Sequence, residues 1–97
     1  MARTAIATKT LTVSTVVKTL SDFGFSAKEI ADARGAYISS VNNTVIVKWD
    51  GTDPTATNGH PVIATLVWQL VEGAPDVVRL RFIRQSADAL VTVTLER

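Results

Sequence analysis

The sequence predicts an all-β fold, an antiparallel β-sandwich or a jelly-roll-like arrangement of strands. Several short segments alternate apolar and polar residues with a period of two, which is typical of half-buried strands. Val, Ile and Thr, which fit a pleated sheet well, are frequent in these segments. Clusters of Gly, Pro, Asn and Asp separate them. Roughly six to eight short strands with turns between them indicate a sandwich or a jelly roll.

The N-terminal part is expected to be an arm over residues 1–10, followed by a single domain over residues 11–97. Leu11, Val13 and Val17 alternate with threonine and serine, so residues 11–20 are interpreted as a strand with a bend near Thr15. The arm is small, polar and weakly patterned.

A short helix over residues 26–34 is the one departure from strands that we expect. Ser26 and Glu29 have the spacing of a capping box, and Gly35 is in position to end the helix. A second short helix ending at Gly24 would produce a helix-turn-helix reader of DNA. We disfavour it because the segment before Gly24 is rich in Thr and Val, which are poor helix formers.

The centre of the predicted fold is a hairpin, with one arm over residues 44–50 and the other over residues 62–70. In the first arm Val45, Val47 and Trp49 share one face. The second arm is apolar on both faces, which predicts a strand covered on both sides.

The loop over residues 50–61 is rich in turn residues and in side-chain oxygen atoms. These oxygens suit a cation, but their spacing is not that of a calcium loop. We expect no metal and instead a loop capped by its own Asx and Ser/Thr turns. The oxygen-bearing residues are Asp50, Asp53, Thr55, Thr57 and Asn58.

Three further strands complete the prediction, over residues 36–41, 77–84 and 90–96. In the second of these, Val78, Leu80 and Phe82 should point inward and the arginines outward. The last strand should bury its alternate apolar residues, which are Val91, Val93 and Leu95.

Composition narrows the possible functions. The 97 residues carry a net charge of +1, so there is no bulk attraction to nucleic acid or to an anionic membrane. No cysteine is present, and the first residues do not have the pattern of a signal peptide. Apolar residues make up 46% of the chain and the mean hydropathy is +0.22, which is high for a small domain. We therefore expect a homo-oligomer in which subunits bury apolar surface.

No catalytic, cofactor-binding or metal-binding constellation is recognisable, so we expect a protein that is not an enzyme. His60 is the one histidine, and it has nearby aspartates but no evident serine nucleophile. Two binding modules remain as alternatives. A basic stripe would suit single-stranded nucleic acid, and Trp49 with Trp68 would suit a carbohydrate. The stripe would consist of Lys48, Arg79, Arg81 and Arg84.

Three segments resemble small structural proteins of bacteriophages and prophages: WDGTDPTATNGHPV at 49–62, VEGAPDVVRLRFIR at 71–84 and VTVTLE at 91–96. The DGT-x-PTA-x-x-GH part is the most specific. The resemblance implies a β-sandwich, no catalytic activity and a place in the virion. Capsid decoration (cement) protein, trimeric and on the capsid surface, is the first expectation, with synthesis in the host cytoplasm. A head–tail adaptor or a tail-associated protein is the alternative.

The expected partners are the major capsid protein or another virion protein, together with further copies of the chain, but neither nucleic acid nor a membrane. The residues expected at such interfaces are Arg3, Ile6, Trp49, Asp53, His60, Trp68, Arg79 and Arg81.

Overall fold

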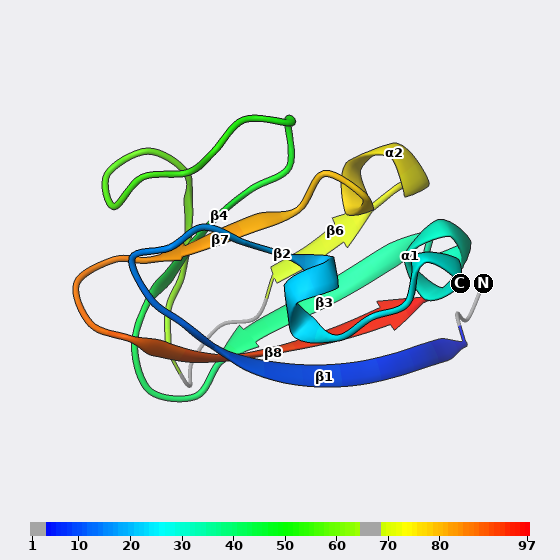
Figure 1. Ribbon diagram of the computed structural model, residues 1–97, viewed down its shortest axis with the longest axis horizontal. Coiled ribbons are helices and arrows are strands. Elements are labelled where there is room, and N and C mark those ends of the chain that lie inside the picture. Colours follow the sequence, from blue (N-terminus) through cyan, green and yellow to red (C-terminus); the bar gives the residue numbers. More distant parts are fainter. Residues whose placement is uncertain (1–3, 65–68) are drawn as a thin grey trace.

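The computed structural model describes residues 4–64 and 69–97, and it contains two antiparallel four-stranded sheets (Figure 1). The all-β prediction is thereby confirmed. The first sheet has the order β1 (Ala5–Val13), β8 (Ala89–Glu96), β3 (Gly35–Ser40), β6 (Gln69–Glu72). The second has the order β2 (Lys18–Thr19), β7 (Arg81–Arg84), β4 (Val45–Lys48), β5 (His60–Val62). Short helical segments connect the strands: the 3-10 helix η1 (Leu20–Phe23), α1 (Ala27–Asp32) and α2 (Ala74–Val77).

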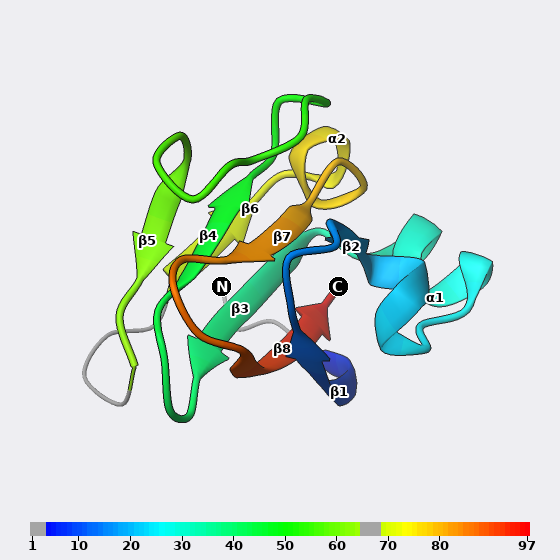
Figure 2. The same ribbon diagram turned by 60° about the vertical axis from the view of Figure 1, so that its left-hand side comes forward.

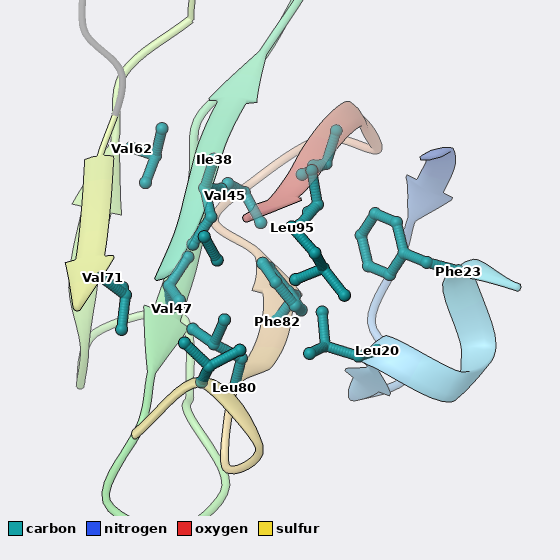
Figure 3. Packing of buried hydrophobic residues seen from close by; sticks show 14 of the residues in the cluster. Leu20, Phe23, Ile38, Val45, Val47, Val62, Val71, Leu80, Phe82 and Leu95 are labelled. Atoms are coloured by element: carbon teal, nitrogen blue, oxygen red, sulfur yellow. The ribbon is translucent and has the colours of Figure 1, made fainter. Parts of the chain in front are cut away.

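The hydrophobic core takes side chains from both sheets (Figure 3). From β8 come Val91, Val93 and Leu95, each fully buried as the alternation predicted. The second sheet contributes residues such as Val47 and Phe82, also fully buried. Because alternate side chains of a strand point to opposite faces, these positions define the inward face of each sheet.

The first strand begins at Ala5 and not at Leu11, so the expected arm over residues 1–10 is wrong for residues 5–10. β8 supplies antiparallel partners for β1 from Glu96 opposite Ala5 to Ala89 opposite Val13, with one irregularity in register between Ala5 and Ala7. These pairs give the threonine-rich segment a place in the sheet. The bend predicted near Thr15 is present, and it separates β1 from β2, which belongs to the other sheet (Figure 2).

The predicted capping box opens α1. The Glu29 backbone N–H donates to Ser26 Oγ at 3.1 Å, and the Ser26 N–H donates to Glu29 Oε1 at 2.8 Å. Gly35 does not end this helix: α1 stops at Asp32, and Gly35 is the first residue of β3. Gly24 does cap the 3-10 helix η1, with φ at +100°.

The hairpin arm predicted over residues 62–70 is wrong as a single strand. Its first residue, Val62, ends β5, which pairs with β4 in the second sheet. Its last residues belong to β6, which pairs with β3 in the first sheet. Ile63, just after Val62, is 48% exposed, whereas Val62 is buried. The two ends of the apolar run therefore lie in different sheets, which periodicity does not reveal; residues 65–68 of the run lie outside the described residues. The strand covered on both faces is β4, where Val45, Ile46 and Val47 are all buried.

The strand predicted over residues 77–84 is likewise shorter than expected. Residues 74–77 form α2, with a proline in its first turn and Asp76 close to the positive N-terminal end. β7 begins only at Arg81. Leu80 and Phe82 are buried as predicted, but Val78 is 52% exposed because the helix turns it away from the core.

Candidate functional site

The loop over residues 50–61 is held by its own polar groups, as predicted. Asp50 Oδ1 accepts a hydrogen bond from the Thr52 hydroxyl at 2.6 Å and from the Thr52 backbone N–H at 3.0 Å. Thr55 and Asn58 bond to each other through their backbones at 3.0 and 3.2 Å. Pro54 is buried in the middle of the loop. An ordered loop of this kind presents a fixed surface, so a partner does not have to order it on binding.

The Thr52 hydroxyl is the largest of the causes that lower the pKa of Asp50 below 3.8, followed by the Thr52 backbone N–H; Lys48 adds to them. Because the folded-state pKa is lowered, the ionised carboxylate stabilises the loop above pH 3.8. This stabilisation is lost as the pH falls from 3.8 through the lower folded-state pKa.

We expect Thr52→Val to raise the pKa of Asp50 toward 3.8, as measured by NMR titration. Thr57→Val, elsewhere in the same loop, is the control and should leave the pKa of Asp50 unchanged. An unchanged Asp50 titration in Thr52→Val would contradict the assignment.

Trp49 and His60 stack at the base of the loop. Their ring centroids are 4.6 Å apart and their planes differ by 17°. Trp49 is partly buried and also packs against the hydrophobic core. A surface pocket of about 210 Å³ lies beside the stack. The pocket is lined by Lys48, Trp49, Asp50, Asn58, Gly59 and His60. The imidazole covers one face of the indole, so only the other face of Trp49 is left for stacking on a carbohydrate.

Three of the four residues of the predicted basic stripe lie close to carboxylates of the same chain. Arg81 pairs with Asp53 at 2.5 Å and Arg84 pairs with Asp88 at 2.6 Å. Lys48 lies 3.8 Å from an oxygen of Asp50. Such exposed pairs add little stability, but the Arg81–Asp53 pair joins the loop to β7, and the stripe offers phosphates less free positive charge.

Four of the expected interface residues come together around the loop: Trp49, Asp53, His60 and Arg81. Strand pairing explains the grouping, because Val47 lies opposite His60 and Lys48 lies opposite Arg81. Arg79 is exposed, and its side chain lies beside Gly51 of the loop.

The remaining expected interface residues lie elsewhere. Ile6 belongs to β1 and packs partly buried against the core. Arg3 and Trp68 lie outside the described residues. Within residues 4–64 and 69–97, no group of three His, Asp or Glu side chains has the proximity needed to hold a metal ion.

The outer face of the β1–β8 pair carries a row of threonines that sequence reasoning did not single out. Thr8 and Thr10 of β1 bond through their hydroxyls to Thr94 and Thr92 of β8, at 2.8 and 3.1 Å. Thr12 is the next residue on the same face of β1. The signal was present as TKTLT at residues 8–12 and TVT at residues 92–94, where threonine recurs at every second position.

Comparisons of the chain with protein-family models, with curated proteins and with solved structures find no match. In the part of the chain that the structure describes, no helix combines the length and the apolar character needed to cross a membrane. The features of the described residues that bear on a partner are the strand order and the exposed polar and charged groups.

Proposed function

We propose that the two sheets form an eight-stranded jelly roll and that the protein is a non-enzymatic structural protein of a bacteriophage virion. The strand pairing is the observation that carries this proposal. β1 pairs with β8, β2 with β7, β3 with β6 and β4 with β5. These nested pairs are those of one long hairpin that is rolled up on itself. The β3–β8 pair completes the first sheet and the β4–β7 pair completes the second (Figure 2). Eight strands arranged in this way make a jelly roll.

Jelly rolls are common in viral capsid proteins, in lectins and in cupins. The fold alone does not fix the function, but the residues favour the viral case. A cupin-type metal centre draws on several histidines, and this chain has one histidine and no cysteine. Trp49, the candidate for carbohydrate stacking, has one ring face covered by His60. The viral reading also agrees with the resemblance of residues 49–62 to phage structural proteins.

Within the virion, capsid decoration is the role that we propose, with the major capsid protein as the partner. The loop over residues 50–61 is exposed at one end of the molecule and is held by internal bonds. A preordered contact loop binds at a smaller entropic cost than a flexible one. A protein that binds the assembled shell but not its free subunits stabilises the shell by mass action.

Shell binding is the test. Particles assembled without this chain are purified, and the recombinant chain is added back over a range of concentrations. We expect saturable binding over the whole shell and a higher temperature of particle disruption. Replacing the exposed Arg79 by alanine should weaken binding, whereas Lys28→Ala, on the exposed side of α1, is the matched control and should not. Absence of binding to complete shells would contradict the decoration role.

Binding of the chain to portal vertices, to tails and to oligonucleotides separates the alternatives. Binding restricted to the portal vertex would assign the chain to the head–tail connection, and binding to tails alone would assign it to the tail. Salt-dependent affinity for oligonucleotides, weakened by Arg79→Ala, would instead point to nucleic-acid binding.

A further inference from the structure

The free edge of β1 is the longest open sheet edge among the described residues. β1 is nine residues long, whereas the other edge strands, β6, β2 and β5, have four, two and three residues. Short edge strands protect a sheet from pairing with other chains, and a long one invites such pairing. In Figure 1 β1 lies along the lower margin of the molecule, with β8 on one side of it.

Hydrogen bonds on β8 reveal which backbone groups of β1 face this edge. The Leu90 N–H donates to Asn42 Oδ1 at 2.9 Å, and the Leu90 carbonyl accepts from the Val41 N–H at 2.9 Å. Both groups of Leu90 are thus used on the side away from β1. Leu90 lies opposite Thr12, so this is a pair without mutual hydrogen bonds. The N–H and C=O of Thr12 consequently point to the free edge.

The same direction recurs at every second residue of β1. The register with β8 is regular from residue 8 to residue 13, and the one irregularity lies between Ala5 and Ala7. The backbone N–H and C=O groups of Thr8, Thr10 and Thr12 therefore all face outward. This stretch has no proline and one charged residue, Lys9, so it has few of the features that block edge-to-edge pairing.

We propose that β1 pairs in antiparallel orientation with β1 of a second copy of this chain, about a twofold axis at Thr10. Thr10 then lies opposite Thr10 of the second copy, and Thr8 lies opposite Thr12. All three outward-facing residues form hydrogen-bonded pairs, which exchange about six N–H···O bonds in total. The β1-β8-β3-β6 sheets of the two copies then form one continuous sheet across the dimer.

A second copy fits this edge better than an unrelated strand does. The outward-facing groups are placed symmetrically about Thr10, which is what an isologous interface requires. Lys9 lies beside Leu11 of the second copy, so no like charges are directly opposite each other. Threonine meets threonine on the outer face, as it already does between β1 and β8. This pairing goes beyond the virion role and does not depend on it.

Solution mass, measured by light scattering over a range of protein and salt concentrations, tests the proposal with two matched variants. Thr10→Lys places two lysines opposite each other at the axis. Thr92→Lys adds the same charge to the same face and removes the same 3.1 Å hydroxyl bond, but one strand away from the edge. We expect the wild type and Thr92→Lys to have twice the 10.4 kDa chain mass. The Thr10→Lys dimer should have a dissociation constant at least about tenfold higher than that of the wild-type dimer. A wild-type monomer, a trimer, or equal effects of both variants would overturn the proposal.

Disulfide cross-linking tests the register without changing the charge. The chain has no cysteine, so single substitutions report unambiguously. Directly opposite residues in a hydrogen-bonded pair are about 5.5 Å apart between Cα atoms, which a disulfide can span. Thr10→Cys should oxidise to a covalent dimer, whereas Thr8→Cys and Thr92→Cys should not. Cross-linking through Thr8→Cys but not through Thr10→Cys would overturn the register. Shell binding can fail while this dimer persists, so the two proposals fail separately.

Discussion

Replacing Phe82 by alanine will lower the free energy of unfolding by about 3–5 kcal/mol. Phe82 lies in β7 and is fully buried. Its neighbours across the sheet are Lys18 of β2 and Val47 of β4. Its ring centroid is 4.9 Å from that of Phe23, with the planes tilted by 54° (Figure 3). The substitution therefore leaves a cavity where strands and the η1 segment meet, and urea unfolding at equilibrium measures the loss.

Two further variants make this result interpretable. Val78→Ala changes a residue that is 52% exposed, so its effect should stay within about 0.5 kcal/mol. Phe82→Leu keeps most of the buried volume and should lose less stability than Phe82→Ala. If Phe82→Ala loses less than about 1 kcal/mol, the ring does not fill the core in the way described.

The inward residues of the strands were predictable because side-chain period is a local property. Val91, Val93 and Leu95 follow a strict alternation, and all three are fully buried. Phe82 was assigned to an inward face by the same reasoning, and it is also fully buried. The turn residues also located the loop between β4 and β5, since its capping depends on neighbours in sequence, but His60 and Pro61 belong to β5 and not to the loop.

The choice of sheet for each strand was not predictable in this way. The apolar run after residue 62 gives the same periodicity whether it continues in one sheet or crosses to another. Only the strand partners show that its two ends lie in different sheets, because β5 pairs with β4 and β6 pairs with β3. Residues 5–10 looked like an arm because the segment that orders them, β8, is at the opposite end of the chain.

The contacts of the candidate site were unpredictable for the same reason. The Trp49–His60 stack and the Arg81–Asp53 pair join residues that the register of β4 brings together. By contrast, the threonine repeat of β1 was visible in the sequence. The repeat does not show, however, that β1 is an edge strand, because the position of a strand in its sheet is seen only in the topology.

Replacing Gly59 by alanine will have the second large effect, a loss of about 3–5 kcal/mol of unfolding free energy. Gly59 has φ at +146°, a region that residues with a Cβ rarely adopt. A Cβ there would also run into Ile46 Cγ2 and would lie 3.2 Å from both Lys48 Cγ and the Val47 carbonyl oxygen. Ile46 is buried in β4, so it has little room to move away. Equilibrium unfolding in urea again provides the measurement.

Gly24 supplies the control that separates the two causes. Its φ is +100°, but a Cβ at Gly24 would meet nothing within 4 Å. Gly24→Ala should therefore show the backbone strain alone, about 1–2 kcal/mol. The additional loss of unfolding free energy in Gly59→Ala then measures the close contact between Gly59 and β4, next to the Trp49–His60 stack. Equal losses in the two variants would mean that backbone conformation, and not this close approach, is what requires glycine at position 59.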